Sequence, residues 1–168
     1  MALQTSPLTD LLEKYDRALP HFSDGRIDYT NAKEAAVLTA FVRHGQDFLL
    51  LKRSSKVGSY AGLWNAVAGY IDQLKPLREK VLEELSEELG VGEASVLSIR
   101  FAPGIIQEDQ ELGRIWMVYP VLVTLSERPS ISLDFEHTES AWAKKEDFPN
   151  YEKVPGFNET FQAVSGLL

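Results

Sequence analysis

The chain has 168 residues, a formal net charge of −8 and 44% hydrophobic residues. Its length allows one domain with a sizeable core, and its ordinary share of charged residues argues against a largely disordered chain. The acidic charge makes duplex nucleic acid and anionic membrane surfaces unfavourable partners. The absence of cysteine excludes disulfides, thiolate metal sites and cysteine nucleophiles.

The first predicted element is a helix with Ser6 as its N-cap, Pro7 in its first turn and Pro20 beyond its end. The polar, turn-rich residues 21–33 then connect it to the main body, so we expect an appended segment over 1–33 and the main domain over 34–168. The start of the chain is not of signal-peptide type, and no apolar run approaches the ~20 residues of a membrane span. We therefore expect a cytoplasmic protein with no membrane partner.

The middle and the end of the chain mix strands and helices without regular alternation. Strands are predicted over 35–42, 48–51, 64–70, 96–101, 114–125 and 141–144, loops over 52–62 and 107–113, and helices over 76–89 and 158–168. Gly90 ends the first of these two helices as a C-cap. This pattern predicts an α+β fold in which a mixed β-sheet is sandwiched between helices.

The helix over 76–89 carries an unusual number of carboxylates. Leucine and valine recur on it every four residues and form an apolar stripe for the core. Glu84, Glu87 and Glu88 lie within one arc of the helix surface, where their oxygens can converge on one divalent cation. Glu84 and Glu88 border the apolar stripe, and half-buried like charges are unfavourable without a cation. The alternative is a solvated acidic face.

The segment Gly69–Val91 resembles the Nudix box, G-x5-E-x7-R-E-U-x-E-E-x-G-U, where U is a bulky aliphatic residue. The two glycines and the three glutamates stand in register across all 23 positions. Two positions depart from the pattern, because Lys75 stands at the first glutamate and Glu83 at the arginine. We expect a charge-swapped Lys75–Glu83 pair to brace the loop against the helix.

The resemblance implies the Nudix fold and a Mg²⁺- or Mn²⁺-dependent hydrolase. Such enzymes cleave the phosphoanhydride bond of a nucleoside diphosphate linked to another moiety, here a small molecule of open identity. The implied metal ligands are Gly69, Glu84, Glu87 and Glu88. The implied catalytic residues, which would orient or deprotonate the attacking water, are Glu84, Glu87, Glu136 and Glu139. Candidate substrate-binding residues are Lys52, Arg53 and Trp64, although core packing is the more favoured use for the tryptophan.

Two other functions stay open at this point. The two altered box positions are compatible with a catalytically weak or inactive Nudix-like module that binds a nucleotide or a protein partner. An isopentenyl-diphosphate isomerase-like enzyme is disfavoured, because that enzyme depends on a cysteine. Homodimerisation is a tendency of the family that the residues themselves do not show. We expect Glu108, Asp109 and Glu111 to lie in a solvated loop and His137 to be structural.

Overall fold

The computed structural model describes residues 7–168, so the predicted N-cap Ser6 lies outside the described part. The helices are α1 (Pro7–Ala18), α2 (Leu77–Leu89) and α3 (Phe157–Ser165), with short 3₁₀ helices η1 (Glu93–Ser95) and η2 (Lys145–Asn150). The strands are β1 (Glu34–His44), β2 (Asp47–Arg53), β3 (Trp64–Asn65), β4 (Val67–Tyr70), β5 (Val96–Phe101), β6 (Ile105–Asp109), β7 (Arg114–Leu125) and β8 (His137–Lys144).

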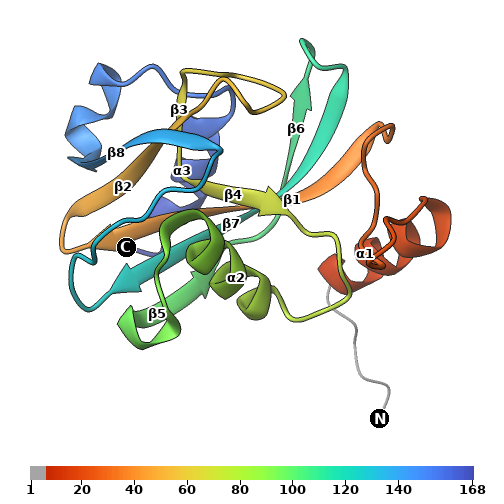
Figure 1. Cartoon of the computed structure of the whole chain (residues 1–168), viewed down its shortest axis with the longest axis horizontal. Helices are drawn as coiled ribbons and strands as arrows, with labels where there is room; N and C mark the ends of the chain where they lie inside the picture. Colours follow the sequence, from red (N-terminus) through yellow and green to blue (C-terminus); the bar gives the residue numbers. More distant parts are fainter. Residues whose placement is uncertain (1–6) are drawn as a thin grey trace.

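The strands form one mixed sheet whose spine is the parallel pair β1 and β7. The other pairings are antiparallel, and they divide the sheet along its length. At one end β4 pairs with β1 and β6 pairs with β7, while toward the other end β2 pairs with β1 and β5 pairs with β7. β8 extends the sheet along β2 (Figure 1).

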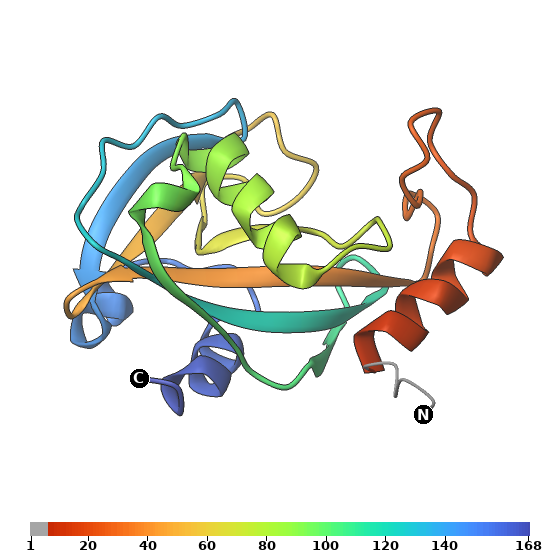
Figure 2. The same cartoon turned by 90° about the horizontal axis from the view of Figure 1, so that it is seen from below.

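Helices cover both faces of this sheet. Figure 2 shows α2 on one side of the long central strands and α3 on the other. Val81, Leu85 and Leu89 of α2 are fully buried in the larger core cluster, as the apolar stripe predicts. Phe157 and Val164 of α3 belong to a second cluster on the opposite face. The predicted mixed sheet between helices is confirmed.

The N-terminal segment packs on the same core as α2. Leu12 and Tyr15 of α1 are buried, and so are Ile27 and Tyr29 of the connecting stretch. The Tyr29 hydroxyl donates a hydrogen bond of 2.8 Å to the carbonyl of Ile71, the residue that follows β4. Within residues 7–168, no helix has the length and apolarity needed to cross a membrane.

Four predicted elements differ from the structure. The predicted loop over 107–113 is wrong in its first half, because residues 105–109 form β6 against β7. The predicted strand over 64–70 divides at Ala66, since β3 pairs with β2 and β4 with β1. β8 begins earlier than predicted, at His137, and α3 ends before the exposed Leu168. Pairing with distant strands decides the strand boundaries, and local sequence patterns do not contain that information.

Candidate metal and phosphate site

The acids of α2 are held in place by the burial of the helix. Its apolar stripe faces the sheet, and Gly90 ends it in the left-handed region at φ 68°, with its N–H directed to the last carbonyls of the helix. Because the stripe faces the sheet, Glu84 and Glu88 are buried, at 7% and 3% exposure, and Glu87 is exposed. The expected position of the first two at the rim of the core is confirmed.

Six carboxylates line one cavity of about 550 Å³. Three come from α2, namely Glu84, Glu87 and Glu88, and the others are Asp72, Asp109 and Glu136, the last just before β8. The charge of Glu136 raises the pKa of both Glu84 and Glu88. The structure therefore brings the acid predicted from the later segment to the acids of the box. Glu139, the other acid predicted there, does not line the cavity.

The absence of a side chain at Gly69 leaves room for the carboxylate of Glu84. It lies on β4 directly beside α2, and a Cβ built on it would overlap with the carboxylate of Glu84. Its backbone conformation is ordinary, so contact and not backbone strain requires glycine here. The first glycine of the predicted box thus allows the helix carboxylate to lie against the strand.

Glu88 is the most buried of these acids. Its Oε2 atom has no hydrogen-bond partner and no solvent contact. Burial raises its pKa well above the ordinary value, and the nearby charges of Glu84, Glu136 and Asp134 raise it further. A hydrogen bond with the backbone of Ala68 opposes this shift. A bound cation would stabilise a buried carboxylate oxygen that has no partner and lies near other carboxylates.

Lys80, which the sequence reading did not select, is the cation nearest to these acids. Its Nζ atom lies 3.1 Å from Glu84 Oε1, 3.5 Å from Asp72 Oδ1 and 3.8 Å from Glu83 Oε2. Burial favours the neutral form of Lys80, but the three carboxylates outweigh it and raise its pKa. Burial also raises the pKa of Glu84, against the effect of Lys80. The short contact between the two side chains favours the charged pair.

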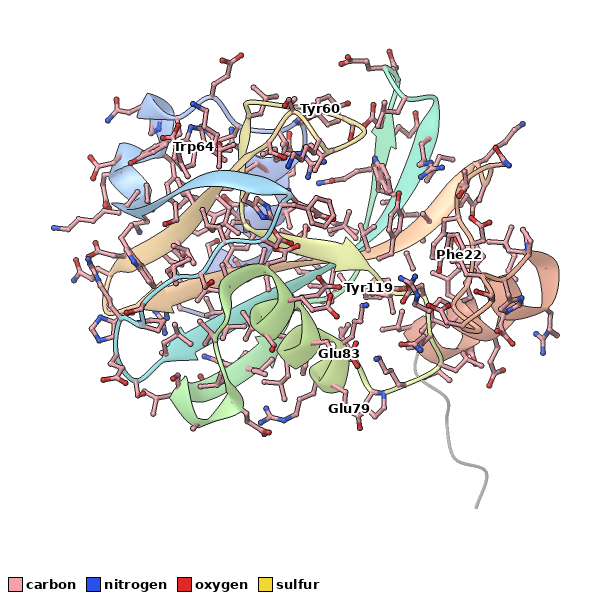
Figure 3. The ribbon with its side chains drawn as sticks, viewed as in Figure 1. Phe22, Tyr60, Trp64, Glu79, Glu83 and Tyr119 are labelled. Atoms are coloured by element: carbon pink, nitrogen blue, oxygen red, sulfur yellow. The ribbon has the colours of Figure 1, made fainter. Side chains whose placement is uncertain are left out.

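The other lysine of the segment, Lys75, forms an ion pair with Glu83. Figure 3 shows Glu83 on the side of α2 that faces the segment leading into the helix. The expected charge-swapped contact is therefore present, with the lysine on the loop and the glutamate on the helix. Its side chains are more exposed than those of Lys80 and Glu84.

The predicted substrate-binding residues separate into two places. Arg53 lines the cavity, and its Nε donates to the carbonyl of Ser59 at 3.0 Å. Burial lowers the pKa of Arg53, while Glu136 and Glu88 oppose that shift. Lys52 instead pairs with Glu139 at 3.0 Å on the outer part of β2 and β8, and neither residue lines the cavity.

Trp64 also lies away from the cavity lining. Its ring packs edge-on against Tyr151 with the centroids 5.1 Å apart. His137, which was expected to be structural, is buried and contacts Asp134 at 2.9 Å.

Asp109 corrects the prediction of a solvated acidic loop. It is buried at the end of β6, where its carboxylate accepts hydrogen bonds from the Tyr60 hydroxyl at 2.7 and 2.8 Å. The Trp116 indole also donates to it, at 3.3 Å. Figure 3 shows Tyr60 on the loop after β2, beside the β6–β7 hairpin. The sequence signal that could have indicated this cluster is the alternation of Gln107 and Asp109, both facing the cavity.

The donor set of the cavity fits a hard divalent cation. Carboxylate oxygens are the ligands that Mg²⁺ and Mn²⁺ prefer, and Glu88 has an oxygen without a partner. However, within residues 7–168 no group of three or more acids or histidines is already gathered closely enough to hold an ion. Glu84 contacts Lys80 instead.

The proteins similar to this chain include nucleoside triphosphatases and Nudix hydrolases. No protein-family model matches the chain. A curated protein from Klebsiella pneumoniae, "Nucleoside triphosphatase NudI", is 25% identical over 128 residues, covering 71% of this chain and 89% of that protein. Two solved structures share the fold. A MutT Nudix hydrolase from Burkholderia pseudomallei has a TM-score of 0.65 and 23% identity, covering 78% of this chain and 98% of that one.

The second structure is the Nudix domain of Shewanella oneidensis NrtR complexed with ADP ribose, with a TM-score of 0.67 and 17% identity, covering 80% of this chain and 89% of that one. At these identities the solved structures support the fold alone. The register of the box and the curated relatives both make this chain similar to Nudix hydrolases.

Proposed function

We propose that this protein is a divalent-metal-dependent Nudix pyrophosphohydrolase that cleaves the phosphoanhydride bond of a nucleotide derivative. The observation that carries the proposal is the buried, unpartnered Oε2 of Glu88, in a cavity that Glu84, Glu87 and Glu136 also line. In that setting Glu84, Glu87, Glu88 and the Gly69 carbonyl would hold Mg²⁺ or Mn²⁺. A bound ion would neutralise the substrate phosphates and polarise the phosphorus under attack.

The remaining groups of the cavity have roles that follow from their charge. Arg53, whose guanidinium is fixed through Ser59, supplies positive charge for a phosphate. Glu136 stands apart from the helix acids in sequence but shares their cavity, so it is the residue that we assign to orienting and deprotonating the attacking water. Trp116 and Tyr70 offer aromatic surface for a base in the same cavity.

Nucleoside triphosphates are the first substrates to test, since the similar NudI proteins are named as nucleoside triphosphatases. A triphosphate is itself a nucleoside diphosphate linked to a further phosphoryl group. ADP-ribose is the second, because the similar NrtR domain is complexed with it. The cavity residues do not distinguish between these two classes.

The test is a Mg²⁺-dependent hydrolysis screen over nucleoside triphosphates, ADP-ribose, nucleoside diphosphate sugars and dinucleotides. We expect turnover of at least one substrate, lost on removal of metal and reduced at least about 100-fold in Glu87→Gln. Glu79→Gln, which changes an exposed acid of the same helix (Figure 3), is the matched control and keeps its activity. No turnover of any substrate, or equal turnover in both variants, contradicts the proposal and favours a module that only binds a nucleotide.

A further inference from the structure

Lys80 is an unusual residue to find beside carboxylates that are proposed to bind metal. Lysine is rarely buried without a paired charge, and here its side chain is about as buried as Glu84 and Asp72, two of the three acids that it contacts. It occupies the position one helical turn before Glu84, so the two side chains meet on the same face of α2. Its ammonium lies between Glu84 and Asp72, which come from different elements.

Charges of alternating sign continue from this lysine to the N-terminal segment. Asp72, only 5% exposed, contacts Lys80 on one side and the Arg26 guanidinium on the other, at 3.4 Å. The Asp72 carbonyl also accepts a hydrogen bond of 2.8 Å from the amide of Ile27. This hydrogen bond and the contact with Arg26 hold Asp72 in place, so Lys80 has a fixed partner on the side away from Glu84.

The contact with Lys80 determines what Glu84 can offer to a metal. One of its oxygens, Oε1, is taken by the ammonium, and the neighbouring strand packs closely against the carboxylate at Gly69. Glu83, the adjacent acid on the helix, pairs with Lys75 and also lies 3.8 Å from Lys80 Nζ. The positive charge beside Glu84 therefore comes from position 80.

We propose that Lys80 is a built-in counter-ion of Glu84: it neutralises and positions this carboxylate in the metal-free protein, and it weakens the binding of a divalent cation there. This inference rests on the proposed metal site. It assigns a role to a residue that touches no substrate, so Lys80 is a positioning residue.

The experiment is a titration of the metal-free protein with Mn²⁺, followed by the signal of free Mn²⁺ in electron paramagnetic resonance. Lys80→Met removes the competing charge, so we expect this variant to bind Mn²⁺ at least about tenfold tighter than the wild type. Two unit charges about 4 Å apart interact by more than the free energy of a tenfold change in affinity at the dielectric typical of proteins. Lys80→Arg keeps the charge and the wild-type affinity. The matched control is Lys75→Met, which removes a lysine that does not contact Glu84 and leaves the affinity unchanged.

A second variant, Asp72→Asn, is expected to change the Mn²⁺ affinity in the opposite direction. Asp72→Asn removes the negative charge that balances Lys80, so Mn²⁺ binding becomes weaker than in the wild type, and this holds even where Lys80→Met does not fold. An affinity in Lys80→Met equal to or lower than that of the wild type overturns the proposal, as does equal tightening in Lys75→Met. The hydrolysis screen of the wild type is independent of these titrations, so a failure of the proposed function is recognised separately.

Metal-free stability provides a further readout. Lys80→Met lowers the melting temperature in chelator, and adding Glu84→Gln to that variant restores at least half of the loss, because Asp72 is then the only buried acid left without the lysine. If the second substitution lowers the melting temperature further, the two side chains do not act as a pair and the proposal is wrong.

Discussion

Two lysine–glutamate pairs involve α2, and they differ in where their partners lie and in how deeply they are buried. Lys75 and Glu83 join the preceding loop to the helix with partly exposed side chains, at 18% and 42%. Lys80 and Glu84 lie one turn apart on the helix, and each side chain is 9% exposed. An exposed pair contributes little to stability, whereas removing one partner of a buried pair leaves an uncompensated charge. The first pair therefore fixes a loop, and the second sets the charge of the site.

The largest difference between the pairs is expected in the free energy of unfolding. Lys80→Met leaves Glu84 and Asp72 buried without their cation, so we expect a loss of about 3 kcal/mol in metal-free protein. Lys75→Met changes the exposed pair and loses less than about 1 kcal/mol. Urea denaturation in the presence of a chelator measures both values. Equal losses would remove the distinction between the two pairs.

The next effect concerns the space beside Glu84. Gly69→Ala places a methyl group where the carboxylate lies, which displaces it from Lys80 and costs about 1–3 kcal/mol in the free energy of unfolding. The same substitution at Gly92 is the control, because a Cβ there meets nothing within 4 Å. Thermal unfolding compares the two variants, and a Gly69→Ala protein as stable as Gly92→Ala would contradict the close approach of strand and helix.

Glu88 extends the comparison to a buried acid without a cation. Its pKa is raised in the folded state, so its contribution favours folding below the unfolded pKa of about 4.3 and is lost as the pH rises through the folded value. Glu88→Gln should therefore stabilise the metal-free protein at pH 8, by about 1.4 kcal/mol for each unit of raised pKa. The gain should shrink toward pH 5. Melting temperatures at the two pH values measure it, and a Glu88→Gln protein that is less stable at pH 8 would be the contrary result.

The smallest effect is expected from reversing the exposed pair. Lys75→Glu with Glu83→Lys restores the order of signs in the box pattern and keeps the contact, so the stability should stay within about 0.5 kcal/mol of the wild type. Each single reversal brings like charges together and loses up to about 1 kcal/mol. Chemical denaturation of the three variants completes the cycle. Additive losses in the double variant would show that Lys75 and Glu83 do not interact.

Sequence patterns predict the helix of the box well, because its properties are local. The four-residue apolar repeat fixes which face of α2 is buried, and Gly90 fixes its end, so the burial of Glu84 and Glu88 follows. The Lys75–Glu83 contact was predictable for the same reason, since the register of the box places both residues.

Contacts between distant segments were not predictable in this way. Lys80 looks like an ordinary helix lysine until the path of residues 71–76 brings Asp72 beside it. Asp109 looks like a loop residue until β6 pairs with β7 and Tyr60 reaches it from another loop. In the opposite direction, Lys52 and Glu139 were selected as site residues, but the antiparallel register of β2 and β8 places them opposite each other and outside the cavity.

The central claim is that the buried acids of α2 form a metal site, and Glu88→Gln tests it most directly. This variant is expected to fold at least as well as the wild type at pH 8, so a loss of binding cannot be attributed to unfolding. Calorimetric titration with Mn²⁺ at that pH should give binding by the wild type and an affinity at least about tenfold weaker in Glu88→Gln. Equal affinities in the two proteins, or no uptake of Mn²⁺ by either, would contradict the account.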